Sequence, residues 1–291
     1  MKVKKRSKLL TRQSDRLSVQ IWSYLVITFC LIFAMIPLSI TIINSTKDNY
    51  SIIENIFAFP EVGTFFKDAA YNYSRAFQEI IAPMGRSIFI ALVGSLGNVT
   101  IGVILAYIFS RKDFPGKEFI FTLYIAIMLV PSIMGMPVLV NFMSNTLHLK
   151  DTYWGYWLPT WGGGQASTLF LFRTFFQQQP LAIYESAEVE GGRDHQIIWY
   201  ISVPLAKAIL MLQFVNGFSS QYNDYLWPSL IFNNKKPLMV VMKSLGQQFQ
   251  TQSQNGAMYA MYIIAAIPLL INTCLNLKEF KSGDFAAGLK L

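Results

Sequence analysis

The most regular pattern of polar residues lies at 177–205, in a hydrophilic stretch between two long apolar segments. Pro180 suits the first turn of a helix, and the following residues LAIYESAEVE continue it with good helix formers. Gly191 and Gly192 supply the backbone freedom that ends a helix and turns the chain, and Asp194 is predicted to cap a second short helix. Two short helices with carboxylates could bind another protein or could be a solvated connector. The pattern alone leaves both interpretations open.

Other reactive residue types are too scattered to form a catalytic centre or a metal site. His148 and His195 lie in different loops without a nearby cysteine, so a metal has no ligand set. Cys30 and Cys274 lie inside apolar runs, where cysteine behaves as a small hydrophobic residue. The phosphate-binding motif GxxxxGK[ST] is missing, because the sequence at 116–118 is GKE. We therefore expect no catalytic residue, no metal and no cofactor in this chain.

Membrane-spanning helices are the elements that must position the polar stretch. Of the 291 residues, 53% are hydrophobic and only 14% are charged. This composition is too apolar for an ordinary soluble domain. A spanning helix needs ~20 apolar residues, and six segments approach or exceed that length. The predicted spans are residues 21–43, 87–110, 119–143, 156–176, 205–226 and 257–277.

Small residues and prolines inside the spans predict how the helices pack. In the second span Gly94, Asn98 and Gly102 repeat every four residues, so a neighbouring helix can approach closely. Pro131 and Pro137 interrupt the third span, and such prolines often mark kinks beside a cavity.

The basic residues indicate the orientation in the membrane. A net charge of +8 would suggest nucleic acid for a soluble protein. Here residues 1–20 carry seven lysines and arginines against one acid, which predicts a cytoplasmic arm and no nucleic-acid partner. Six spans over 21–277 then place the basic tail 278–291 in the cytoplasm as well. Residues 44–85, with short amphipathic helices, and 228–256 become external loops.

The polar stretch also matches a known signature. It resembles the EAA loop of permease subunits of ABC importers, in which a glutamate, small residues, an acid, a glycine and a proline stand at set spacings. Four residues depart from the usual pattern, since Ser186 and Gly192 replace alanines, Glu190 replaces an aspartate and Ile198 replaces an aromatic residue. The residues that carry the resemblance are Glu185, Ala187, Glu190, Gly191 and Pro204. The resemblance implies a coupling loop at 178–204 whose functional residues are these five together with Ser186 and Gly192.

Further stretches in the same order extend the resemblance along nearly the whole chain. They are AYIFSRKDFPGK at 106–117, LHLKDTYWG at 147–155 and FRTFFQQQP at 172–180. The chain therefore resembles the second permease subunit of a maltose-type carbohydrate ABC importer, an inner-membrane component of binding-protein-dependent transport. This resemblance implies an all-α membrane protein with the type I ABC importer permease fold, six transmembrane helices and both termini in the cytoplasm.

The same resemblance implies a mechanism and a set of partners. The loop would fit a cleft of an ATP-hydrolysing subunit, where Glu185 would pair with a basic residue, and a rocking ATPase would tilt the fifth span through Pro204 and Leu205. The implied partners are a second permease that forms a heterodimer, two ABC ATPase subunits that use ATP and magnesium, an extracytoplasmic solute-binding protein, and a sugar or oligosaccharide. The implied location is the bacterial cell membrane.

Polar residues inside the fourth and fifth spans are candidates for the path of the sugar. At about 100° per residue, several of them share one face of each helix. Amides beside an aromatic ring could bind a sugar weakly enough to release it, or the same groups could hydrogen-bond helix to helix for ~0.6 to 2 kcal/mol each. We favour the path for Asn216, Ser220 and Trp161, and helix packing for Gln165. The full predicted set is Trp161, Gln165, Gln213, Asn216, Ser220 and Asn223.

Two other functional classes fit less well. An ion-coupled secondary transporter of small polar solutes usually keeps ionisable residues near the midplane. Here Arg173 is expected near the inner headgroups, where it can snorkel, and Asp224 near the outer end of its span. An intramembrane enzyme would need a nucleophile and base or a metal triad inside the bilayer, and neither histidine lies in a span. The sequence does not specify which sugar is carried.

Overall fold

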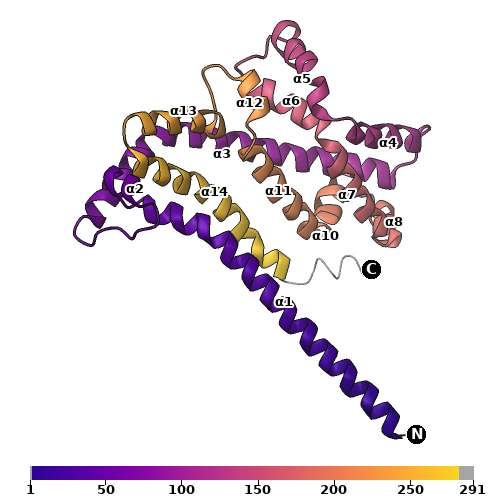
Figure 1. The fold of residues 1–291 in the computed structure, drawn as a ribbon. Helices are drawn as coiled ribbons and strands as arrows, with labels where there is room; N and C mark the ends of the chain where they lie inside the picture. The colour runs from indigo at the N-terminus through magenta and orange to yellow at the C-terminus, as the bar shows by residue number, and fades with distance from the viewer. Residues whose placement is uncertain (1, 282–291) are drawn as a thin grey trace. The chain divides into compact units, whose positions relative to one another are not determined.

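Every regular element of the described residues is a helix (Figure 1). The computed structural model describes the backbone of residues 2–281 and the side chains of residues 19–275. In chain order the helices are α1 Lys2–Asn44, α2 Asn49–Glu54, α3 Phe65–Arg111, α4 Lys117–Ala126, α5 Ser132–Asn141, α6 Tyr153–Gly163, α7 Gln165–Gln178, α8 Leu181–Val189, α9 Asp194–Ile197, α10 Val203–Leu205, α11 Lys207–Tyr222, α12 Leu226–Ile231, α13 Leu238–Thr251 and α14 Asn255–Lys281. There are also one 3₁₀ turn, η1 Ile127–Leu129, and two π-helical turns, η2 Phe142–Thr146 and η3 Ile198–Ser202.

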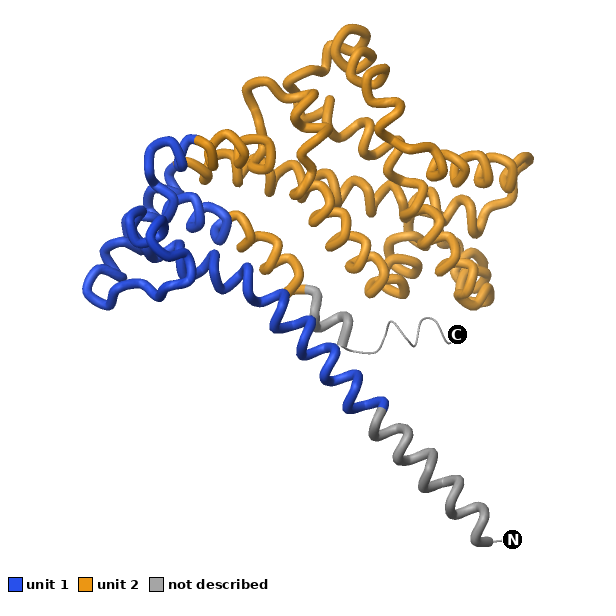
Figure 2. Tube along the Cα trace, viewed as in Figure 1, with its two compact units in different colours: residues 1–78, 248–264 blue, residues 79–247, 265–291 orange. Residues whose placement is uncertain are grey.

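The chain divides into two compact units (Figure 2). Unit 1 contains residues 1–78 and 248–264, and unit 2 contains residues 79–247 and 265–291. The coupling-loop and path residues predicted from the sequence all belong to unit 2. The C-terminal part of the tail, residues 282–291, lies outside the described residues.

In unit 1, a polar cluster ties the end of α1 to the start of α3. The amide of Asn72 donates to the backbone oxygens of Ser45 and Lys47 at 3.0 and 2.8 Å. Gly256 must remain a glycine there, since an added Cβ would lie 2.3 Å from the Asn72 amide nitrogen. Ser45 and Lys47, just after the C-terminal end of α1, are buried in this cluster, but the apolar part of α1, residues 19–42, exposes nearly all its large hydrophobic side chains.

Three helices of the described residues are long and apolar enough to cross a membrane, and two bent pairs could add two more crossings. The predicted first, second and sixth spans fall within α1, α3 and α14. Helix α3 is much longer than predicted, because it begins at Phe65 inside the expected external loop. The expected loop at 228–256 is also largely helical, since it contains α13 and most of α12.

The third span is not one helix. The pair Lys117–Leu129 and Ser132–Thr146 bends by 98°. Val130 is extended, with φ −85° and ψ 120°, because the ring of the following Pro131 disfavours helical geometry at the preceding residue. The kink predicted at Pro131 is therefore a bend of 98°, and a single crossing over 119–143 stays a prediction.

The fourth span is also divided, and the fifth follows a sharp bend. The segment predicted as the fourth consists of α6 and α7, which meet at Gly164, and it is not among the candidate spans of the described residues. The fifth consists of α11 alone, Lys207–Tyr222, which follows a bend of 85° after Leu205. Six crossings therefore remain a prediction.

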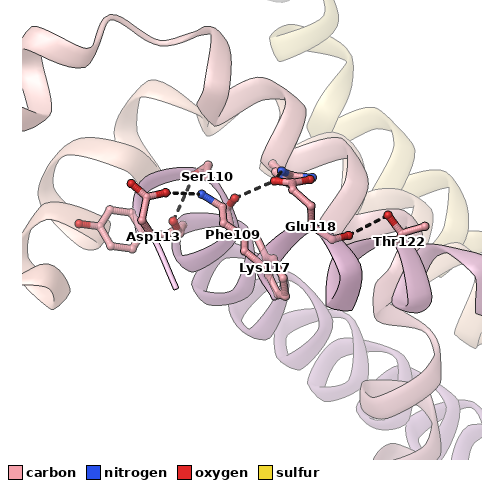
Figure 3. A network of polar contacts seen from close by, with 8 residues as sticks. Phe109, Ser110, Asp113, Lys117, Glu118 and Thr122 are labelled. Carbon is pink, nitrogen blue, oxygen red and sulfur yellow. Dashed lines mark hydrogen bonds and ion pairs between the residues drawn. The ribbon is translucent and has the colours of Figure 1, made fainter. Parts of the chain in front are cut away.

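Arg173 on α7, which was expected to snorkel, is instead buried within the protein. Its side chain is buried, its Nε donates to the backbone oxygen of Phe109 at 3.1 Å, and its Nη2 pairs with the Glu118 carboxylate. Its guanidinium also lies 3.8 Å from the centre of the Phe121 ring. Figure 3 shows Glu118 beside the last turns of α3 and Lys117 directed to Asp113. A buried cation needs a partner, and the start of α4 supplies one within the chain.

Candidate functional site

The first half of the EAA-like loop is a helix that ends in a glycine turn. Helix α8 follows Pro180, as predicted. Gly191 has φ +81°, a left-handed conformation that favours glycine. The Gly191 N–H donates to the Glu188 oxygen at 3.0 Å and the Gly192 N–H donates to the Ala187 oxygen at 2.8 Å. These two bonds define a Schellman motif, so the predicted glycine bend is confirmed.

The second half returns the chain to the membrane segment. Helix α9 begins at Asp194, and its N-cap is Arg193, whose backbone N–H donates to Gln196 Oε1 at 2.9 Å. The prediction of Asp194 as the cap is therefore wrong by one residue, since its backbone is already helical. The chain continues through η3 and α10, where the exposed Pro204 lies, and bends at Ala206 into α11.

One side of the loop is part of the hydrophobic core of unit 2. Tyr184, Ile197 and Ile198 are buried in a cluster with residues of α3, α7 and α11. The Tyr184 hydroxyl also lies 3.2 Å from the Ser202 hydroxyl and hydrogen-bonds the Gln179 side chain. The loop is therefore seated on the helices by apolar side chains from both of its halves.

The opposite side of the loop faces outward. Glu185, Ser186 and Glu190 are exposed, whereas Ala187 and Gly192 are half-buried at the turn. The same loop also exposes apolar side chains, including Val189 at 88% and Tyr200 at 79% exposure. An exposed surface that combines carboxylates with large apolar groups is suited to contact with another protein.

The polar face predicted on the fourth span is directed to α3. The Trp161 indole donates to the Gly94 oxygen at 3.0 Å, and the Gln165 amide donates to Asn98 Oδ1 at 2.7 Å. The close approach predicted for this face of α3 is confirmed, because a Cβ on Gly102 would lie 2.4 Å from the Thr168 methyl group. Gln165 is fully buried, in agreement with its expected packing role.

The polar face predicted on the fifth span is divided between burial and exposure. Asn216, Ser220 and Asn223 are exposed on α11, and the apolar residues of the opposite face include buried Val215 and Phe218. Gln213 is half-buried and donates to the Thr168 hydroxyl at 2.7 Å, which joins α11 to α7. The structure therefore connects Trp161 and Gln165 to α3, while the exposed amides lie on α11.

Three residues near these sites were missed by sequence reasoning. Arg111 and Lys112 at the end of α3 contact the EAA-like loop, and the basic pair in the stretch 106–117 was the available signal. Gln221 is buried, and its amide fills the space where a Cβ on Gly94 would lie. Among the described residues, no group of three histidine, cysteine or acidic side chains is placed to hold a metal.

The broken apolar helices and the outward-facing loop are features of a membrane permease. Residues 98–277 match the family described as "Binding-protein-dependent transport system inner membrane component", over more than half of the chain. The chain belongs to this family, and it is a permease subunit of the ABC importer class, not its ATPase.

Individual relatives resemble the chain over most of its length. It is 28% identical to "Protein LplC" of Bacillus subtilis (strain 168), over 81% of this chain and 82% of that protein. It is 26% identical to the "Maltodextrin transport system permease protein MdxG" of the same organism, over 97% of this chain and 100% of that one. Its fold is similar, with a TM-score of 0.73 at 20% identity, to a chain in the crystal structure of a bacterial ABC transporter involved in the import of the acidic polysaccharide alginate, with 92% and 98% of the two chains covered.

Proposed function

We propose that this chain passes a sugar or oligosaccharide across the cell membrane as one permease subunit of an ATP-driven importer. The observation that carries the proposal is the family match over 98–277, which includes the whole EAA-like loop. The similarity to a maltodextrin permease and to an alginate importer supports a carbohydrate substrate. A solute-binding protein on the outer side would deliver the substrate.

The loop at 178–204 acts as the coupling joint in this proposal. Its buried side is fixed to the core by Tyr184, Ile197 and Ile198, and its outer side presents Glu185 and Glu190. An ATPase subunit that binds the outer side would move the loop as a unit, because the Schellman turn at Gly191 and Gly192 fixes the backbone between its helices. The displacement would enter α11 through Pro204 and the bend at Ala206. The functional loop residues are Glu185, Ser186, Ala187, Glu190, Gly191, Gly192 and Pro204.

For the topology we propose six crossings within residues 21–277. The three long apolar helices, the bent pair Lys117–Thr146, the α6–α7 segment and α11 would each cross once. The basic arm 1–20 and the tail 278–291 then both lie in the cytoplasm, in accord with the charge distribution.

The partners follow from what this chain lacks and exposes. Its sequence has no phosphate-binding loop, so two ATPase subunits would supply ATP and magnesium chemistry. The large hydrophobic side chains of residues 19–38 are exposed along α1, and lipid or a second permease in a heterodimer would cover them.

The proposed sugar path follows the exposed polar side chains of α11. Asn216, Ser220 and Asn223 offer amides and a hydroxyl, and Trp161 is a half-buried aromatic platform stacked on Trp157 at 5.8 Å between ring centres. Gln165 and Gln213 contribute through their hydrogen bonds to Asn98 and Thr168, which hold the surrounding helices in place.

The test compares proteoliposomes that contain this chain alone with proteoliposomes that also contain the second permease, the ATPases and the binding protein. We expect ATP hydrolysis and accumulation of labelled oligosaccharide only in the complete assembly. Sugar accumulation by the chain alone, driven by a proton or sodium gradient, would contradict the proposal and indicate a secondary transporter.

A further inference from the structure

One amine at the end of α3 connects both helices of the coupling loop. Lys112 Nζ lies 2.6 Å from Asp194 Oδ1 on α9 and 3.4 Å from Glu188 Oε1 on α8. The two carboxylates stand on opposite sides of the Gly191 turn. The Tyr107 hydroxyl, one turn earlier on α3, also donates to Asp194 Oδ1 at 3.1 Å. We call the group Lys112, Glu188 and Asp194 the Lys112 bridge.

The neighbouring arginine anchors the same end of α3 to the start of the loop. Arg111 Nη2 donates to the backbone oxygen of Gln179 at 3.0 Å and also to that of Phe176, at the end of α7. Its guanidinium lies 3.9 Å from the centre of the Tyr184 ring on α8. The last turn of α3 thus contacts the loop before, within and after its first helix.

An earlier part of α3, around Gly94 and Gly97, contacts Trp161 of the proposed sugar path. The Gly94 oxygen accepts the Trp161 indole N–H, and a Cβ on Gly97 would lie 2.3 Å from that indole. A displacement of the end of α3 would therefore change the support of Trp161, because closely packed helices have no free space to absorb it.

We infer that Lys112 is a positioning residue that fixes the angle between the two loop helices and ties the loop to α3. A displacement of the loop is then transmitted to two helices, α3 and α11. This inference rests on the proposed coupling role of the loop. Its geometric part, the restraint of the loop by Lys112, can be tested in the full chain without any partner.

We expect substitutions of Lys112 to change the orientation of the loop helices more than the stability of the fold. The side chains of Lys112, Glu188 and Asp194 are 37%, 52% and 58% exposed, and ion pairs that exposed contribute little to folding. The hydrogen bond with Asp194 raises the pKa of Lys112, so the amine remains charged at neutral pH. Variants at 112 should therefore fold, which makes the loop geometry measurable.

The experiment places spin labels at Leu96→Cys on α3 and Val189→Cys on α8, with Cys30 and Cys274 replaced by alanine, in the full chain in nanodiscs. Both labelled side chains are exposed, and neither belongs to the bridge. Pulsed electron paramagnetic resonance should give a narrow distribution of distances between the two labels. Lys112→Met should broaden this distribution at least twofold, and Lys112→Arg should preserve its width. The matched control Lys117→Met removes an ion pair with Asp113 that does not involve the loop, and it should leave the distribution narrow.

An unchanged distribution in Lys112→Met would overturn the inference. The functional consequence is then measured in the assembled importer, where Lys112→Met should keep ATPase binding but lower the sugar imported per ATP by at least threefold. Full coupling in Lys112→Met, with the distance distribution broadened, would also overturn the claim that the bridge serves transport. Failure of the coupling role itself would appear separately, as normal uptake when Glu185 is reversed to lysine.

Discussion

The coupling loop and the polar face of the fourth segment use their polar side chains in opposite ways. In the loop Tyr184 and Ile197 are buried while Glu185 and Glu190 face outward. In α6 and α7 the polar groups of Trp161 and Gln165 are directed inward to α3. Outside the bilayer water can solvate a carboxylate, but within it a polar group needs a partner in the protein. A polar face inside a span therefore predicts helix packing as readily as ligand binding.

The largest expected effect comes from breaking the loop at its turn. Gly191→Val places a β-branched residue at φ +81° and should abolish the bend, because that backbone conformation is strained for any side chain with a branched Cβ. We expect uptake by the assembled importer to fall at least tenfold with normal membrane insertion. The matched control is Gly63→Val, where an added Cβ meets no atom within 4 Å and φ is not positive. Equal uptake in the two variants would remove the distinction between the turn and an ordinary loop.

The next effect concerns the packing of Trp161 on α3. Gly97→Leu would force a side chain into the indole, since even a Cβ lies 2.3 Å from it. Overpacking of this kind costs about 1 to 3 kcal/mol. The midpoint of thermal unfolding in detergent should fall, whereas Gly85→Leu on the same helix has open space and should leave it unchanged. Similar midpoints in both variants would show that Trp161 is free to move.

A pair of smaller changes separates packing from the proposed path. Gln165→Leu removes the bond from buried Gln165 to half-buried Asn98 and should lower stability by ~0.6 to 2 kcal/mol. Asn216→Leu changes an exposed residue and should leave the thermal midpoint unchanged, but it should reduce uptake while binding-protein-stimulated ATPase activity continues. If Asn216→Leu instead lowers stability and assembly, this residue also holds helices together and the proposed path fails there.

The smallest effect tests a polar contact outside the spans. Burial alone would raise the pKa of Asp151, but hydrogen bonds from Asn234, Lys235 and Asn233 lower it overall. Because the folded pKa is lowered, this carboxylate stabilises the loops at neutral pH, and the contribution is lost as the pH falls through the folded value. Compared with Asp151→Asn, the wild-type chain should protect the amides of residues 233–235 from hydrogen exchange at pH 7 but not near pH 2. Equal protection at pH 7 would contradict this role.

Local chemistry made the loop predictable, while packing geometry did not follow from the sequence. Pro180 and Gly191 act on their own backbone, so helix, turn and helix could be inferred from residue types. The 98° break after Val130 was foreseen only as a kink, because Pro131 permits a range of angles and tertiary contacts select one. The bonds from Trp161 to Gly94 and from Lys112 to Asp194 join residues far apart in the chain. No local pattern could place those partners opposite each other.

The central claim is that the outward side of the loop binds the ATPase, and charge reversal at Glu185 tests it most directly. The complete importer is purified through a tag on this chain, with Glu61→Lys as a control at another exposed glutamate. The account predicts that Glu185→Lys lowers both the co-purified ATPase and sugar uptake at least tenfold, while Glu61→Lys retains both. Wild-type assembly and uptake in Glu185→Lys would contradict the assignment of this loop as the coupling joint.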